Sequence, residues 1–341
     1  MKVAVYYNNK DIRIEEVPKP EIEDGEVLIR VEASGICGSD LMEWYRVPKA
    51  PLVLGHEVTG EIVETGCKVK NFKTGDRVVV THHVPCNTCH FCLTDRHTLC
   101  PMIKKTSFDP GGFSEYLRIP EINVDRGMFV LPSEVSFAEG TFTEPLGCVV
   151  RGIRNIGFGP GESVAIIGSG VAGLLNLQYI RSLAPGRVYA IDIDEFKLKS
   201  AVNFGASYAF NANDNLAAKI LETNSEKLCD LVIVCTGVKN AIDQAFEIVE
   251  KGGRILFFAP SDPDTVLNID FNKFWWSGIK IVSSYAASPK DMALALELIK
   301  NKRVDIEKMI THRLPLSEIK MGFDLASSQS ESLKIIINPH S

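Results

Sequence analysis

Two patterns of hydrophobic and polar residues divide the chain near residue 145. Before this point, short β-like runs such as 26–31 and 57–64 are separated by turns that contain glycine, as at 74–76. Such runs are typical of a mostly β domain. The segment 86–100 has little periodicity, so we expect an ordered loop that something other than a hydrophobic core must stabilise.

After residue 145, apolar runs alternate with helical patterns, the first of them over 174–183. The runs lie at 163–167, 188–191, 231–234 and 255–258. Strands that are buried on both faces of a sheet have this apolar character, and the alternation predicts a parallel, doubly wound sheet. A helix over 291–300 and a strand over 333–337 follow, and we expect this last part of the chain to return to the first domain.

These patterns predict an α/β protein with a mostly β domain over 1–145 and 288–341 and a Rossmann domain over 146–287. A chain of 341 residues, 45% of them apolar and 23% charged, is long enough to bury two cores. Its net charge of −6 argues against a nucleic-acid partner.

The expected location is the cytoplasm. Residues 1–7 lack the charged and then apolar layout of a signal peptide, and no apolar run approaches the roughly 20 residues that span a bilayer. We therefore expect no membrane partner. In a reducing compartment, the clustering of four of the nine cysteines indicates metal binding before disulfides, and Cys67, Cys229 and Cys235 are interpreted as structural.

The four clustered cysteines have the spacing C-x2-C-x2-C-x7-C. They are Cys86, Cys89, Cys92 and Cys100. Tetrahedral zinc prefers four such ligands at about 2.3 Å, and two-residue gaps let successive thiolates fold around one ion. An iron–sulfur cluster and two disulfides are the alternatives. Four protein ligands leave no open position, so the predicted zinc is structural.

A cofactor motif follows the apolar run at 163–167 and begins a helical pattern. It is the G-x-G-x-x-G sequence made by Gly168, Ser169, Gly170, Val171, Ala172 and Gly173. Its glycines let the backbone approach a pyrophosphate at the helix N-terminus. Asp192 ends the next predicted strand, where an acid bonds the adenosine ribose, so we expect NAD rather than NADP. Asp194 is interpreted as a solvated turn residue.

Two further motifs carry a resemblance to a known family. Residues 35–40 read GICGSD and contain Cys37, and residues 55–69 begin GHEVTG and contain His56. The second stretch resembles the signature of zinc-containing alcohol dehydrogenases of the medium-chain superfamily, and the cysteine segment resembles their structural-zinc loop. The likeness runs from Lys2 to Pro339. It implies a GroES-like first domain and a place near the sorbitol/polyol and threonine dehydrogenase branch.

The resemblance implies a catalytic zinc held by Cys37, His56 and Glu144. Glu144 resembles the acidic third ligand of the polyol and threonine branches, where classical alcohol dehydrogenases have a cysteine, and Cys148 is the rival. Glu57 is a further candidate that enters the zinc sphere transiently or lies just outside it. Three protein ligands leave a fourth position for the substrate alcohol, whose pKa the zinc lowers.

The same likeness assigns roles around the zinc. Asp40 is expected to accept the second N–H of His56, as partners of metal-bound histidines usually do. Ser39 matches the hydroxyl residue that takes the alcohol proton. The usual next member of the relay is a histidine, but Met42 stands there, so water, the cofactor ribose or Glu43 is expected to take over.

Three residues are assigned to substrate or cofactor. His82 and His83 are expected to line the substrate pocket and to give it a polar wall, a surface pair being the alternative. Lys197 is a further candidate for contact with the adenosine ribose.

The sequence thus predicts an NAD- and zinc-dependent dehydrogenase of a secondary alcohol, most simply a polyol or sugar. L-threonine 3-dehydrogenase is the alternative. A non-catalytic module that binds zinc and NAD, and a zinc-free quinone reductase, are disfavoured by the intact ligand sets. The resemblance also implies a homotetramer or homodimer built through the Rossmann domains.

Overall fold

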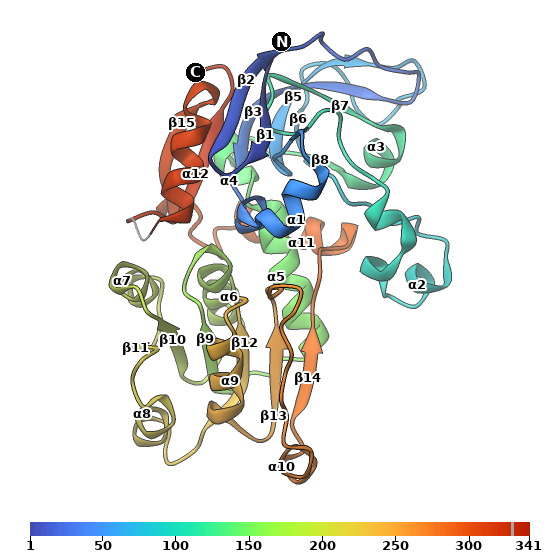
Figure 1. Cartoon of the computed structure of the whole chain (residues 1–341). Helices are drawn as coiled ribbons and strands as arrows, with labels where there is room; N and C mark the ends of the chain where they lie inside the picture. The colour runs from blue at the N-terminus through green and yellow to red at the C-terminus, as the bar shows by residue number, and fades with distance from the viewer. Residues whose placement is uncertain (329–330) are drawn as a thin grey trace. The chain divides into compact units, whose positions relative to one another are not determined.

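A computed structural model describes residues 1–328 and 331–341. The chain divides into two compact units (Figure 1). The first contains residues 1–147, 286–302 and 306–341, and the second contains residues 148–285 and 303–305. Within the described residues, no helix is both long and apolar enough to cross a membrane.

The first unit is built on two β-sheets. The larger has the strand order β15-β16-β3-β5-β6-β8, with β7 also paired to β3, and the smaller has the order β2-β1-β4. The strands of the larger sheet are β3 (Val27–Gly35), β5 (Glu57–Thr65), β6 (Arg77–Thr81), β7 (Tyr116–Ile119), β8 (Met128–Val130), β15 (Ile310–Pro315) and β16 (Lys334–Asn338). The smaller sheet contains β1 (Lys2–Asn8), β2 (Asp11–Glu16) and β4 (Leu52–Val53).

Alternating residues of these strands form the core of the first unit. Val27, Ile29 and Val31 of β3 are fully buried against Val58 and Ile62 of β5. Successive side chains of a strand point to opposite faces, so Val27, Ile29 and Val31 share one packed face, and Leu28, which points to the other face, is also fully buried.

The first unit also contains helices, most of them short. They are α1 (Glu43–Arg46), α2 (His90–Leu93), α3 (Glu121–Gly127), α4 (Phe137–Gly140), α11 (Pro289–Lys300) and α12 (Ile319–Ser327). The 3-10 turns are η1 (Gly38–Leu41), η2 (Val47–Lys49), η3 (His97–Leu99), η4 (Pro101–Lys104), η5 (Glu307–Met309) and η6 (Leu316–Glu318). The predicted helix over 291–300 lies within α11, which begins earlier because Ser288 and Asp291 form a capping box with Pro289 at the first helical position.

The second unit is a six-stranded sheet in which every pair is parallel, with the order β11-β10-β9-β12-β13-β14. The strands are β9 (Val164–Ile167), β10 (Val188–Asp192), β11 (Tyr208–Asn211), β12 (Cys229–Val234), β13 (Val249–Phe257) and β14 (Lys280–Ser283). Its helices are α6 (Val171–Arg181), α7 (Glu195–Asn203), α8 (Leu216–Thr223), α9 (Lys239–Ile248) and α10 (Phe271–Ser277), and α5 (Thr143–Ile156) contains the boundary between the units. The chain starts at β9 and builds outward in both directions, which is the doubly wound order.

The predicted fold class is confirmed. The four apolar runs form the central strands β9, β10, β12 and β13, whereas the edge strands β11 and β14 were not predicted. Both edge strands contain no fully buried residue, so their sequences lack the apolar run that marks a central strand.

Candidate active site

The four clustered cysteines converge on one point in the first unit. Their sulfur atoms all lie within 4.8 Å of one another. The Sγ atoms of Cys86 and Cys92 are 3.9 Å apart, and those of Cys89 and Cys92 are 3.6 Å apart. A zinc tetrahedron with bonds of about 2.3 Å has sulfur–sulfur edges of about 3.8 Å. The donor set therefore fits zinc, and none of the nine cysteines, all in the described part of the chain, forms a disulfide.

Backbone hydrogen bonds favour the thiolate form of Cys86, whereas burial and the neighbouring thiols raise the pKa of Cys92 to about 12. Cys86 Sγ accepts the N–H of Cys89 at 3.2 Å, and Cys100 Sγ accepts the N–H of Cys86 at 3.3 Å. Hydrogen bonds from Thr88 and Cys89 lower the pKa of Cys86 to about 5. Apart from the cysteines, Ile103 is the one buried apolar residue in this cluster of described residues, so the segment has almost no core of its own. A metal bound by the four cysteines would supply the missing stabilisation.

A second cluster forms where β3 ends and β5 begins. Gly35 of β3 pairs with Glu57 of β5 in the antiparallel ladder, so Cys37, two residues past Gly35, lies beside His56. Ligand atoms of Cys37, His56 and Glu57 all lie within 4.8 Å of one another. Gly55 has φ +94° and approaches the backbone of Phe113, where a Cβ would lie 2.8 Å from its nitrogen. Glycine is therefore required just before the histidine.

Asp40 gives this second cluster a negative potential. Its Oδ1 lies 3.4 Å from Nδ1 of His56, and its Oδ2 accepts the N–H of Cys37 at 3.1 Å. Burial alone would lower the pKa of His56, but Asp40 and Cys37 raise it well above its ordinary value. A site that favours a positive charge this strongly suits a cation, and Nε2 of His56 is left to bind it.

Glu57 is held by a lysine that sequence reasoning missed. Nζ of Lys334 pairs with Oε2 of Glu57 and donates to the carbonyl of Ile36 at 3.0 Å. Both charged side chains are 1% exposed. The only available signal was a single lysine inside the apolar run at the end of the chain, because a charge on a buried strand needs a partner.

The structure places Glu144 in the first turn of α5, where it is buried. It does not belong to the set of ligand atoms within 4.8 Å, which contains Glu57 instead. Cys148 lies one helical turn further along α5 and is half-buried. The identity of the third ligand stays a prediction, with Glu57 and Glu144 as the carboxylates to compare.

Arg46 is the second residue that the sequence did not identify. Its Nη2 donates to Oγ of Ser39 and to Oδ1 of Asp40, both at 3.1 Å, and its Nε donates to the carbonyl of Ser39 at 3.0 Å. Glu43, which was proposed as a proton exit, accepts the N–H of Asn9 at 3.0 Å. The guanidinium of Arg46 therefore contacts the hydroxyl of Ser39. The relay histidine expected after Ser39 is replaced by Met42 in the sequence.

His82 and His83 form a pair next to this cluster. Their ring centres are 3.6 Å apart, and the ring of His82 lies 4.8 Å from that of His56. Burial, helped by neighbouring positive charges, lowers the pKa of His82 well below its ordinary value and that of His83 to about 4. Both rings are neutral at pH 7 and can exchange hydrogen bonds with hydroxyl groups.

The G-x-G-x-x-G motif joins β9 to α6 in the second unit. Gly168 has φ +95°, and a Cβ on Gly173 would lie 1.9 Å from the carbonyl oxygen of Gly168, so both positions require glycine. Around a Cβ on Gly170, by contrast, no atom lies within 4 Å, which leaves room at the start of α6. This tight turn with an open helix N-terminus fits a pyrophosphate.

Asp192 lies at the end of β10 and is turned toward this motif. Its Oδ2 accepts the N–H of Ser169 at 2.7 Å, and its Oδ1 accepts that of Ile193 at 2.8 Å. The interpretation of Asp194 as a solvated turn residue was wrong. Its side chain caps α7 by accepting the N–H groups of Phe196 and Lys197. An aspartate before a helix is a preferred N-cap, which explains its position.

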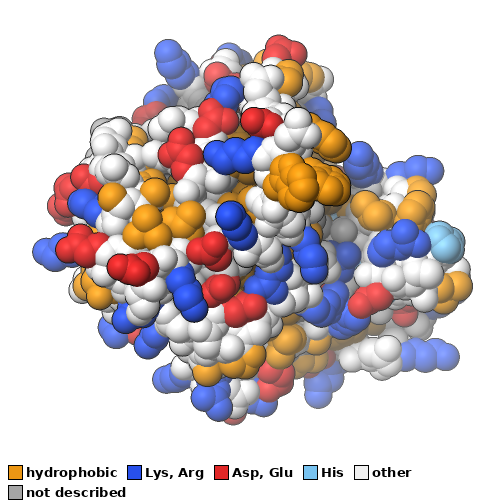
Figure 2. Space-filling model, turned by 90° about the horizontal axis from the view of Figure 1, so that it is seen from below, with side chains coloured by type: hydrophobic (Ala, Val, Ile, Leu, Met, Phe, Trp, Pro, Cys, Tyr) orange, Lys and Arg blue, Asp and Glu red, His pale blue; other side chains and the backbone are white. Residues whose placement is uncertain are grey.

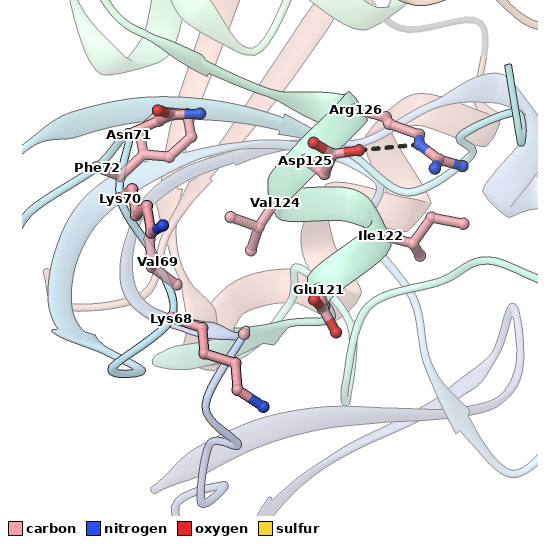
Figure 3. A pocket seen from close by; sticks show the side chains of 11 residues that line it. Lys68, Val69, Lys70, Asn71, Phe72, Glu121, Ile122, Val124, Asp125 and Arg126 are labelled. Atoms are coloured by element: carbon pink, nitrogen blue, oxygen red, sulfur yellow. Dashed lines mark hydrogen bonds and ion pairs between the residues drawn. The ribbon is translucent and has the colours of Figure 1, made fainter.

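A surface hollow of the first unit lies elsewhere. It has a volume of about 510 Å³ and is lined by Gly25, residues 68–72 and residues 121–126 (Figure 3). It shares no residue with either cluster or with the histidine pair. Figure 3 shows Asp125 and Arg126 paired with each other on its rim, so we assign this hollow no catalytic role.

Comparisons with known proteins identify the family of the chain. Residues 23–126 match the alcohol dehydrogenase GroES-like domain, and residues 172–301 match the zinc-binding dehydrogenase family. The chain is 30% identical over 352 residues to sorbitol dehydrogenase of Bacillus subtilis (strain 168), covering 100% of this chain and 98% of the relative. It is 32% identical over 336 residues to L-threonine 3-dehydrogenase of Bacillus velezensis, covering 96% and 95%.

A solved structure from Sinorhizobium meliloti 1021 has the same fold. It is described as a candidate zinc-binding dehydrogenase bound to NADP, with a TM-score of 0.89, 25% identity and coverage of 99% of both chains. The chain belongs to the zinc-containing alcohol dehydrogenase family of medium-chain dehydrogenases. It is a zinc-dependent dehydrogenase of alcohols, with zinc and a nicotinamide dinucleotide as cofactors.

Proposed function

We propose that this dehydrogenase oxidises a secondary hydroxyl of a polyol or sugar to a ketone and transfers the hydride to NAD. The observation that carries the proposal is the cluster of Cys37, His56 and the carboxylate of Glu57. The neutral pair His82 and His83 lies beside it. A pocket wall of neutral imidazoles offers donors and acceptors to a substrate rich in hydroxyl groups.

Zinc, when bound by Cys37, His56 and either Glu144 or Glu57, would polarise the alcohol and lower its pKa. The protein residues prepare this chemistry. Asp40 holds the imidazole of His56 by its Nδ1, which fixes the ring and leaves Nε2 for the metal. The hydroxyl of Ser39 accepts the alcohol proton and releases it to solvent, because Arg46 beside it is permanently protonated and cannot take it.

The proposed preference for NAD over NADP rests on Asp192. A 2′-phosphate would meet a carboxylate at the end of β10, whereas two ribose hydroxyls can donate to it. Lys197 is proposed as a further ribose contact; its Nζ lies 4.0 Å from Asp194. A reducing, cytoplasmic location is part of the proposal, and the absence of disulfides among the nine cysteines, each of them described, supports it.

We further propose that the active form is a homodimer or homotetramer joined through the second unit. Phe271, Trp275 and Trp276 of α10 are 72%, 61% and 75% exposed. Figure 2 shows separate patches of hydrophobic side chains among charged ones on the face viewed from below. Exposed patches of this kind mark protein interfaces, and β14 beside them is a sheet edge. Light scattering should give at least twice the chain mass, and a Trp276→Lys chain that keeps the same mass would refute the interface.

A substrate panel tests the proposed activity. Zinc-loaded protein is mixed with NAD and, in turn, with polyols, hexoses, simple secondary alcohols and L-threonine, and the absorbance of NADH is followed at 340 nm. Polyols or sugars are expected to give the highest kcat/KM. Highest turnover of L-threonine would instead select the alternative that the Bacillus velezensis relative supports. No turnover of any alcohol would leave only the non-catalytic binding module.

A further inference from the structure

Two cationic side chains lie next to the candidate active site, on the helical segment that follows Ser39. Arg46 ends α1 and Lys49 ends η2. The Cζ atom of Arg46 lies 4.7 Å from the ring centre of Tyr45, and Nζ of Lys49 lies 3.5 Å from it. Two positive charges therefore contact one aromatic ring.

These charges are only partly balanced within the described residues. Arg46 is 13% exposed and pairs with Asp40, but Asp40 also faces His56 and the metal cluster. Lys49 is exposed and forms no ion pair with any described residue; its contact is the Tyr45 ring. Burial alone would raise the pKa of Tyr45, yet the hydrogen bond and charge of Lys49, together with the charge of Arg46, lower it. The potential at the Tyr45 ring is thus positive.

The same two positive charges act on Ser39 and His83, which are expected to contact the substrate. Arg46 donates to Oγ of Ser39, the hydroxyl expected to accept the alcohol proton. Burial and the charge of His56 are the main causes of the low pKa of His83, but Arg46 and Lys49 also contribute to it. A neutral polyol would gain little from two fixed cations, whereas keeping a guanidinium mostly buried costs desolvation energy.

We infer that Arg46 and Lys49 bind an anionic group, a phosphate ester or a carboxylate, carried by the alcohol that is oxidised. The inference rests on the proposed function and narrows its substrate from polyols in general to those bearing an oxyanion. Nε and Nη2 of Arg46 donate to Ser39 and Asp40, so Nη1 is the atom that would donate to the oxyanion, and Lys49 adds a point charge. His82 and His83, neutral at pH 7, would face the hydroxyl groups.

Matched substrate pairs test this inference on the zinc-loaded enzyme. Sorbitol is compared with sorbitol 6-phosphate and with gluconate. At least one anionic compound is expected to exceed its neutral counterpart about tenfold in kcat/KM, as one charge-assisted contact would give. The phosphate and carboxylate arms show which oxyanion the site takes.

A lysine variant separates anion binding from catalysis. Lys49→Met should raise KM for the preferred anionic substrate about tenfold and leave kcat and the kinetics with sorbitol unchanged. Lys49→Arg should retain most of the affinity. Lys73→Met, an exposed lysine in the loop before β6, is the matched control and should change nothing.

Calorimetry with inorganic phosphate gives a readout that does not depend on turnover. Phosphate should bind the zinc-loaded wild type and bind the Lys49→Met chain at least several-fold more weakly. Equal kcat/KM for neutral and anionic substrates, or phosphate binding that is absent or insensitive to Lys49, would overturn the inference. Absence of turnover with every alcohol, together with phosphate binding that depends on Lys49, would refute the proposed function while supporting the anion site.

Discussion

The pairing of Lys334 with Glu57 makes a quantitative prediction about the stability of the first unit. Both side chains are 1% exposed, and Nζ of Lys334 has only Oε2 of Glu57 and the carbonyl of Ile36 as described polar partners. Lys334→Met keeps the length and the apolar stem of the side chain but removes the charge. The carboxylate of Glu57 is then left in a buried site without its counter-ion.

Breaking a buried pair by removing one partner costs about 3–5 kcal/mol. At about 1.4 kcal/mol per tenfold change, the opening equilibrium of the first unit should rise by two to more than three orders of magnitude. Replacing both partners, in the Glu57→Met/Lys334→Met chain, should recover most of that loss, because no uncompensated charge remains. Bound zinc should reduce the effect, since a cation beside Cys37 and His56 would partly replace the charge of Lys334.

Hydrogen exchange resolved by peptide and mass spectrometry is the suitable assay, because two units need not unfold in one step. Peptides from β5 and β16 should lose protection in Lys334→Met, and peptides from β9 and β10 should not. Lys73→Met is the control for a lysine on the surface. A loss below about 1 kcal/mol in zinc-free protein, or a double variant less stable than the single one, would refute the reasoning about the buried charge.

Three further predictions concern single sites. Asp192→Ser should narrow the preference for NAD over NADP at least tenfold in kcat/KM, and an unchanged ratio would remove Asp192 from cofactor selection. Glu144→Ala should abolish turnover with the fold retained by circular dichroism, whereas Glu57→Gln, which also removes the counter-ion of Lys334, should leave measurable turnover. The reverse order, with the fold of Glu57→Gln retained, would make Glu57 the third ligand. Burial lowers the pKa of His83 from 6.5 to about 4, so the unfolded chain binds its proton first, and stability should fall as the pH drops from about 6.5 toward 4. His83→Asn should flatten that part of a urea-unfolding pH profile, and a superimposable profile would contradict the assignment.

The sequence predicted the central strands of the second unit but not the elements that depend on distant contacts. The central strands β9, β10, β12 and β13 were predictable because burial on both faces demands apolar side chains. The edge strands β11 and β14 carry mixed residues, since only one side of each pairs with a neighbour. Tertiary pairing, which no local pattern encodes, decides that such segments are strands.

The candidate site divides in the same way. Cys37, His56 and the four clustered cysteines stand in motifs whose spacing is local, so the sequence could identify them. Lys334 lies 277 residues from its partner Glu57, and nothing near it in the sequence marks the contact. Arg46 is only seven residues from Ser39, but the turn through η1 and α1 that brings them together has no recognisable pattern. Both missed residues are cations. Lys334 pairs with Glu57, a predicted ligand, and Arg46 donates to the hydroxyl of Ser39.

The central claim is that Cys37 and His56 hold a zinc ion for catalysis, separate from the zinc held by the four clustered cysteines. Elemental analysis and NADH formation, measured together on wild type, Cys37→Ser and Cys92→Ser chains after dialysis, test it most directly. The two clusters predict about two zinc ions per wild-type chain, about one and no turnover in Cys37→Ser, and about one with a less protected 86–100 segment in Cys92→Ser. A Cys37→Ser chain that keeps both zinc ions or turns over at the wild-type rate would contradict the account.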